Sequence, residues 1–86
     1  MSKKAINKLK NNYKSYELNV ETVQLTEKNA TGQNVPVQAA KAFITIFEHT
    51  EKGAVINKKS NAYGTGTTFK EAQANAIELA VEGLGI

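Results

Sequence analysis

The stretch GTGTTFKEAQANAIELAVEGLG, from Gly64 to Gly85, decides the fold of this chain. It begins with glycines and threonines and continues as an alanine-rich segment, in which apolar residues recur every three or four positions. This spacing places them on one stripe of a helix. The stripe consists of Phe69, Ala72, Ala76, Ala80 and Leu84. The small alanines in its middle predict that the helix packs closely against a sheet.

Both ends of this predicted helix carry signals. TFKE is a capping box: the Thr68 hydroxyl is expected to accept from the Glu71 amide, and the Glu71 carboxylate from the Thr68 amide. Gly83 is the expected residue just past the C-terminus. Gly64 and Gly66 allow two interpretations, because free amides at a helix start also bind phosphate. The stretch lacks the Gly-Lys-Ser/Thr of a P-loop, so a tight turn is the favoured role.

Three segments before this helix alternate as β-strands do. In residues 16–27 the apolar set shifts by one at Val23 and Leu25, which predicts a β-bulge just before Val23, or a twisted strand end. AAKAFITIFEH, residues 39–49, is apolar on both faces. It is predicted to be a central strand that is covered on both sides or has one face at an interface. AVINKKSNAYG, residues 54–64, then returns as the second strand of a hairpin.

The N-terminal segment, residues 1–14, holds five lysines and no acid. The rest of the chain holds six lysines and eight glutamates, so +5 and −2 give the net charge of +3. Residues 3–14 are predicted to form a short helix. Such a basic arm attracts phosphate, or it is a solvated terminus that aids solubility. The whole chain, residues 1–86, is predicted to be a single α+β domain: a three-stranded antiparallel sheet packed by a C-terminal helix, in the order α-β-β-β-α.

Composition argues against catalysis. The chain has one histidine, His49, and neither aspartate nor cysteine, so a Ser-His-Asp or Cys-His arrangement is unavailable. His49 is expected to be a side chain at a sheet edge, and no carboxylate spacing suggests a metal site. We expect no catalytic residues, no cofactor and no metal. Since the N-terminus lacks a signal-peptide core and no apolar run approaches about 20 residues, we expect a cytoplasmic protein without a membrane partner.

The closing stretch resembles the end of a double-stranded-RNA-binding domain. That family has Gly-x-Gly-x-Ser-Lys-Lys-x-Ala-Lys-x-x-Ala-Ala-x-x-Ala-Leu between its third strand and last helix. The positions in the same register are Gly64, Gly66, Thr68, Lys70, Ala72, Ala76 and Ala80. The resemblance implies the α-β-β-β-α fold. It also counts against RNA binding of the family's type, because two of the three phosphate-clamping lysines are Phe69 and Gln73 here, and TGQNVPVQ lacks the family's Gly-Pro-x-His loop.

A second resemblance involves KAFITIFEHTEKG and YGTGTTFKEAQANAIELAVEGLGI. They are similar to phage single-strand annealing proteins of the Rad52-like and Erf-like groups, in which such a strand and hairpin precede a glycine-containing turn and an alanine-rich helix ending in Leu-Gly. Those domains are usually longer than this chain. The resemblance implies a phage protein.

The leading prediction is a small non-catalytic domain that binds nucleic acid, RNA or DNA, through a lysine-rich face and the start of the last helix. The predicted contact residues are Lys3, Lys4, Lys8, Lys10, Lys58, Lys59, Thr68 and Lys70. Tyr13, Tyr16 and Tyr63 are predicted platforms for stacked bases. The alternative is a protein-interaction or dimerisation module of a phage or mobile-element regulator. It would use the second apolar face of AAKAFITIF, or that strand's edge, to bind a second copy or another protein.

Overall fold

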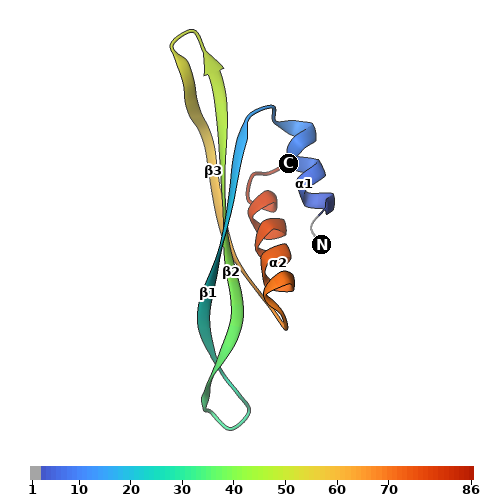
Figure 1. Cartoon of the computed structure of the whole chain (residues 1–86), viewed down its shortest axis with the longest axis vertical. Coiled ribbons are helices and arrows are strands. Elements are labelled where there is room, and N and C mark those ends of the chain that lie inside the picture. The colour runs from blue at the N-terminus through green and yellow to red at the C-terminus, as the bar shows by residue number, and fades with distance from the viewer. Residues whose placement is uncertain (1–2) are drawn as a thin grey trace.

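The computed structural model describes residues 3–86, so Met1 and Ser2 of the predicted basic arm lie outside the described residues. The three strands form one antiparallel sheet in the order β1-β2-β3, and both helices lie on the same side of it (Figure 1). This arrangement confirms the predicted α+β fold. The elements are α1 (Lys3–Asn12), β1 (Tyr16–Lys28), β2 (Asn34–Thr50), β3 (Gly53–Gly66) and α2 (Phe69–Glu82).

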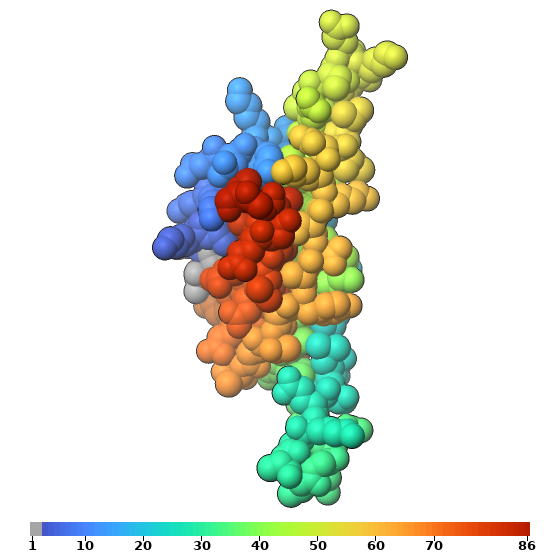
Figure 2. Space-filling view, turned by 180° about the vertical axis from the view of Figure 1, so that it is seen from behind, coloured from blue at the N-terminus to red at the C-terminus, as the bar shows by residue number. Residues whose placement is uncertain are grey.

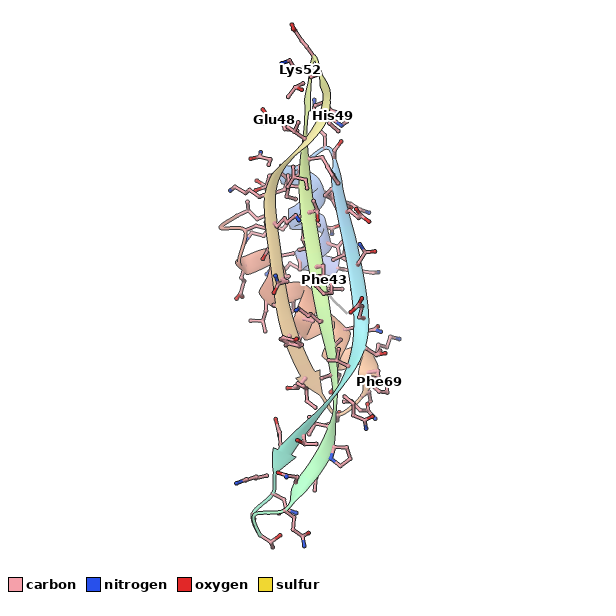
Figure 3. The ribbon with its side chains drawn as sticks, turned by 90° about the vertical axis from the view of Figure 1, so that its left-hand side faces the viewer. Phe43, Glu48, His49, Lys52 and Phe69 are labelled. Atoms are coloured by element: carbon pink, nitrogen blue, oxygen red, sulfur yellow. The ribbon has the colours of Figure 1, made fainter. Side chains whose placement is uncertain are left out.

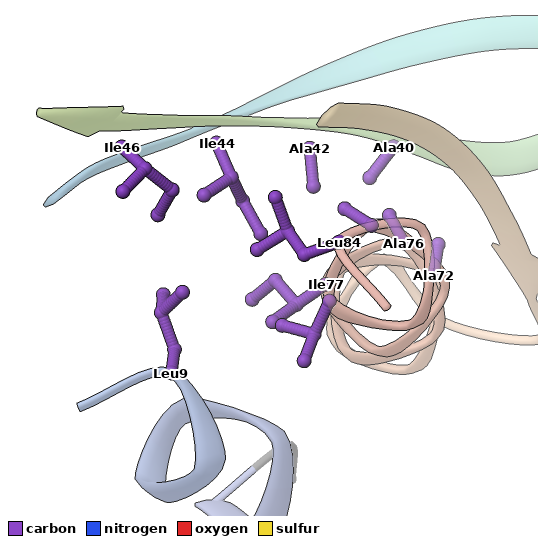
Figure 4. Close-up of a cluster of buried hydrophobic side chains, with 11 residues drawn as sticks. Leu9, Ala40, Ala42, Ile44, Ile46, Ala72, Ala76, Ile77 and Leu84 are labelled. Atoms are coloured by element: carbon purple, nitrogen blue, oxygen red, sulfur yellow. The ribbon is translucent and has the colours of Figure 1, made fainter. Parts of the chain in front are cut away.

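The core lies between β2 and the two helices (Figure 4). Alternate residues of β2 point toward the helices, as the pleat of a strand requires. α1 contributes Leu9, which is fully buried. The other buried members are Ala40, Ala42, Ile44, Ile46, Ala72, Ala76, Ile77, Ala80, Val81 and Leu84. The alanines of α2 therefore occupy the predicted stripe.

Phe69 is the exception to that stripe. Its side chain is 46% exposed, so its predicted place in the core is wrong. The reason is its position: α2 begins at Phe69, immediately beyond the end of the three-stranded region, where Gln38 of β2 pairs with Gly66 of β3. The three-stranded part of the sheet ends before the first helical residue, so it does not cover the Phe69 side chain.

The molecule is elongated, with extents of 58 × 23 × 18 Å. Its radius of gyration is 15.4 Å, against about 12 Å for a compact chain of this length. The excess comes from the β1–β2 and β2–β3 hairpins, whose tips project past the part of the sheet that the helices cover (Figure 2). The hairpin tips are consequently exposed, and the core occupies only the middle of the sheet.

The predicted bulge in β1 is wrong. The β1–β2 register runs without a break from Tyr16↔Ile46 to Lys28↔Asn34. Val23 therefore lies opposite Ala39, on the sheet face that points away from the helices. Val23 is half-buried there, beside the fully buried Ala39. The register shift lies instead between Ile46 and Phe47 where β2 pairs with β3.

Candidate nucleic-acid interface

The glycines before α2 permit close packing. A Cβ atom at Gly64 would lie 2.5 Å from the Ala72 carbonyl oxygen and 2.8 Å from the Ala76 Cα, which are impossible contacts. At Gly66, a Cβ atom would lie 2.6 Å from the Cβ of Glu71. Both glycines are thus required where β3 turns into α2. This steric need supports the turn interpretation over the phosphate loop.

The start of α2 carries the predicted cap in a modified form. Thr68 Oγ1 accepts from the Glu71 amide at 3.1 Å, as expected. The Glu71 carboxylate, however, accepts from the amide of Thr67 at 3.0 Å and from its hydroxyl at 2.6 Å. The predicted bond to the Thr68 amide is wrong, because Thr68 is extended (φ −130°, ψ 159°) and the residue before it reaches the carboxylate instead.

These bonds also fix the charge at the helix start. The hydroxyl and then the amide of Thr67 lower the pKa of Glu71, since they stabilise its charged form, and desolvation opposes them. The carboxylate therefore stays ionised beside the positive end of the helix dipole. A negative charge lies where the sequence predicted a phosphate, next to Thr68 and Lys70.

The lysines of α1 are all exposed, and the helix contains no acidic residue. At 100° per residue, Lys4 and Lys8 lie on one flank of the apolar stripe, while Lys3 and Lys10 lie on the other. Lys4 and Lys8 line a surface depression together with two glutamates of α2, Glu78 and Glu82. The flank that carries Lys3 and Lys10 is not part of that depression.

Lys58 and Lys59 lie on opposite faces of the sheet, because successive side chains of a strand alternate. Lys58 is on the helix side opposite Ile46, and its Nζ donates to the Leu84 carbonyl at 3.4 Å. Lys59 is on the other side, opposite Thr45. Lys70 belongs to the first turn of α2, about 20 Å along the helix from the end that Lys58 contacts. The structure thus distributes the predicted lysines over several surfaces and does not bring them into one face.

The sheet face opposite the helices carries an arrangement that the sequence reasoning missed. Lys41 Nζ lies 4.9 Å from the centre of the Phe43 ring and 4.8 Å from that of Tyr63. Figure 3 views this face, with Phe43 near its middle. The sequence feature that could have indicated this cluster is Lys41, a lysine within the most apolar predicted strand. Of the predicted stacking tyrosines, Tyr63 is 51% exposed here, whereas Tyr13 and Tyr16 pack against the core.

His49 lies near the end of β2 and is exposed, in agreement with the expected sheet-edge position. Its Nε2 is 2.6 Å from the Ser15 hydroxyl, a contact that the sequence did not suggest. A nucleophilic serine also needs a group that orients the histidine, and no carboxylate of residues 3–86 hydrogen-bonds to His49. Together with the bond from the Phe47 amide to the Ser15 carbonyl at 3.0 Å, the pair holds the α1–β1 loop against β2.

Comparison of the chain with protein-family models, with curated protein sequences and with solved structures found no match. The described part of the chain contains no group of three or more His, Cys, Asp or Glu side chains suited to a metal ion. Within residues 3–86, no helix is both long and apolar enough to cross a membrane. Function must therefore be inferred from the surfaces of the fold.

Proposed function

We propose that this protein is a non-catalytic nucleic-acid-binding domain that contacts phosphates through α1. The observation that supports the proposal is the surface of this helix: four exposed lysines and no acid within ten residues. Lys14 lies two residues beyond the end of this helix. A dense run of cations on one helix attracts a polyanion, and the release of condensed counterions supplies the affinity. Phosphate contacts carry no base information, so RNA and DNA both fit.

The predicted contact lysines outside α1 are less suited to binding phosphate. Lys70 adjoins the ionised Glu71, and Lys58 donates to a carbonyl. Within α1, the glutamates of α2 reduce the potential near Lys4 and Lys8. We therefore expect the flank that carries Lys3 and Lys10 to contribute most of the binding.

The test is a charge reversal with a matched control. The variant Lys3→Glu/Lys10→Glu should weaken binding of a labelled duplex or single strand about tenfold or more at about 50 mM salt, and reduce the slope of log affinity against log salt by about two. Lys28→Glu/Lys52→Glu makes the same charge change at the hairpin tips and should alter affinity much less. Fluorescence anisotropy measures both.

Two results would contradict the proposal. One is the absence of binding to either nucleic acid at about 50 mM salt, where electrostatic binding is strong. The other is an equal loss of affinity in the hairpin-tip variant, which would mean that only net charge matters and that α1 is not the contact surface. Circular dichroism of each variant verifies that the fold is retained.

A further inference from the structure

The sheet face that points away from the helices has no cover among residues 3–86 (Figure 3). We call it the open face. Its aromatic residues are Phe43 and Phe47 on the central strand β2 and Tyr63 on β3, and its border strands β1 and β3 carry charges. From the strand register, its middle part consists of Glu17, Asn19, Glu21, Lys41, Phe43, Thr45, Phe47, Lys59, Asn61 and Tyr63. Nearer the hairpin tips, the same face also carries Val23, Leu25, Val37, Ala39, Ile56 and Thr65.

We propose that the open face binds a second copy of this chain, face to face, with a two-fold axis parallel to the strands. Antiparallel sheets commonly pack in this aligned manner, with the side chains of the two faces interdigitating. An exposed group of apolar residues with a polar rim is a common mark of a protein–protein contact. The choice of partner follows from the distribution of charge over the face.

The charges are arranged in rows across the three strands. One row consists of Glu17, Thr45 and Lys59, since Glu17 pairs with Thr45 and Thr45 pairs with Lys59. The row two residues further along the strands is Asn19, Phe43 and Asn61. The next is Glu21, Lys41 and Tyr63. In these three rows the β1 border is acidic and the β3 border basic, and their four charged residues sum to zero.

A two-fold axis along the strands makes this pattern self-complementary. It places β2 over β2 and β1 of one copy over β3 of the other. Glu17 then faces Lys59 of the second copy, twice per dimer, and Phe43 packs against its own symmetry mate. Such isologous contacts are the rule in dimers with two-fold symmetry.

The other face-to-face arrangement is unfavourable. An axis across the strands, through the Phe43 row, places β1 over β1 in the reverse direction. Glu17 would then face Glu21 of the second copy, and this repulsion would also occur twice. Like charges opposed in an interface suppress the wrong arrangement. The positions of the glutamates therefore select the axis that runs along the strands.

Lys41 is the one charge near the proposed axis. The axis sets it opposite its own symmetry mate. Within its own chain, Lys41 lies opposite Glu21 in the strand register, and its Nζ lies over the rings of Phe43 and Tyr63. In the dimer, the row of Glu21, Lys41 and Tyr63 occurs once in each copy. The two rows together hold two lysines and two glutamates, so they carry no net charge. This neutrality also disfavours a polyanion as the occupant of the face.

The size of the face predicts a weak dimer. Three strands at about 4.8 Å spacing and eight residue steps of about 3.3 Å give a footprint of roughly 380 Å² per chain. A standard stable interface buries about 800 Å² on each partner. We therefore expect a concentration-dependent dimer with a dissociation constant between about 1 μM and 1 mM.

Sedimentation equilibrium without nucleic acid tests the proposal. Glu17→Lys and Lys59→Glu, each alone, should weaken the dimer about tenfold or more, because two attractive contacts become repulsive. The double variant Glu17→Lys/Lys59→Glu should restore it, since the swapped charges again face each other. The two residues are separated by β2 within one chain, so the restoration reports contacts between copies. Glu51→Lys/Lys52→Glu swaps charges at the hairpin tip and serves as the control, which should leave the dimer affinity unchanged.

Three results would overturn the proposal. The first is a strict monomer at about 1 mM. The second is a tighter dimer in Glu17→Lys, which the axis across the strands predicts. The third is a monomer whose Phe43→Ala variant loses affinity for single-stranded DNA, which would mean that the face stacks bases. The first two results are measured in the absence of nucleic acid, so they are independent of the role proposed for α1.

Discussion

At the scale of single residues, Gly64 sets the distance between α2 and the sheet. Any Cβ atom at this position would overlap the backbone of the helix at Ala72 and Ala76. We expect Gly64→Ala to destabilise the fold by about 2–4 kcal/mol, because the helix as a whole would have to move away from β3. Urea denaturation followed by circular dichroism measures the change.

Gly32 supplies the control for this prediction. It has a positive φ of 83°. Unlike Gly64, it has room for a side chain, because a Cβ atom at this position would have no neighbour within 4 Å. Asparagine tolerates this backbone conformation. Gly32→Asn should therefore cost less than about 1 kcal/mol. Equal stability of the Gly64→Ala variant and the unmodified protein would show that α2 is not held at the distance we describe.

The sequence reached the right residues at the start of α2 but not every bond. The capping pattern correctly predicted that Thr68 accepts from Glu71. It placed the return bond at Thr68, because a pattern of residue types contains no backbone angles. The same limit applies at the C-terminus of α2. Gly83 directly follows the last helical residue, as predicted, but its conformation is right-handed (φ −63°, ψ −18°), and Gly85 has the positive φ.

The reason for Gly83 lies in the tertiary structure. A Cβ atom there would lie 2.6 Å from the Ser60 hydroxyl of β3, and this hydroxyl donates to the Ala80 carbonyl at 2.7 Å. A Cβ atom at position 83 would displace the Ser60 hydroxyl from this bond, so the glycine leaves room for Ser60 and does not supply a special backbone conformation. Only the pairing of β3 with α2 reveals this requirement, so no local pattern predicts it.

At the scale of elements, α1 depends on one side chain. Leu9 is the only fully buried residue of this ten-residue helix within the described chain. Helices of this length are marginal in water without tertiary contacts. Leu9→Ala should cost about 2–4 kcal/mol of docking energy, so α1 should unfold locally while the sheet persists.

Hydrogen exchange measures this prediction by element. Amides of α1 should lose protection in Leu9→Ala, whereas those of β2 should keep most of theirs. Nucleic-acid affinity should also fall, although no lysine has changed, because the cations would no longer be held on one helix. Asn7→Ala, at an exposed position of the same helix, should leave both properties nearly unchanged. Unaltered protection of α1 in Leu9→Ala would show that another contact holds the helix.

The elements themselves were predictable because alternation and helical spacing are local properties. The short basic helix, the three strands and the closing helix all form, although β2 begins at Asn34, before the predicted start at residue 39. The register was harder. Val23 and Leu25 suggested a bulge, since a shift of apolar residues has two explanations: an extra residue, or apolar side chains on both faces. The structure shows the second, and the actual irregularity lies near Phe47, where no pattern of residues signals it.

At the scale of the whole molecule, the candidate site was only partly predictable. The lysine count of the N-terminal segment identified α1 as a cationic helix. The idea of one lysine-rich face assumed that distant lysines converge, and this depends on the register of β3 and the direction of α2. Those features place Lys58 and Lys59 on opposite faces and Lys70 at the far end of α2. Charge counting cannot supply such information.

The two proposals together define a molecule with two outward contact surfaces. In the proposed dimer the sheets meet in the centre, and the two α1 helices lie on opposite outer sides. One chain is 23 Å across in the direction in which the helices cover the sheet (Figure 1), so the pair spans roughly twice that, 46 Å. A single straight duplex cannot contact both helices at once. The dimer would therefore hold two nucleic-acid segments, one on each side.

This geometry predicts bridging. Two duplexes, one labelled with a donor and one with an acceptor, should show energy transfer when the protein is above its dimer dissociation constant. Glu17→Lys should bind each duplex without bridging, because it leaves α1 intact and weakens the dimer. Restoring the dimer with Glu17→Lys/Lys59→Glu should restore the transfer. Lys3→Glu/Lys10→Glu should dimerise without bridging. Equal transfer with the monomeric variant would show that each chain binds two segments by itself, and that bridging needs no contact between the open faces.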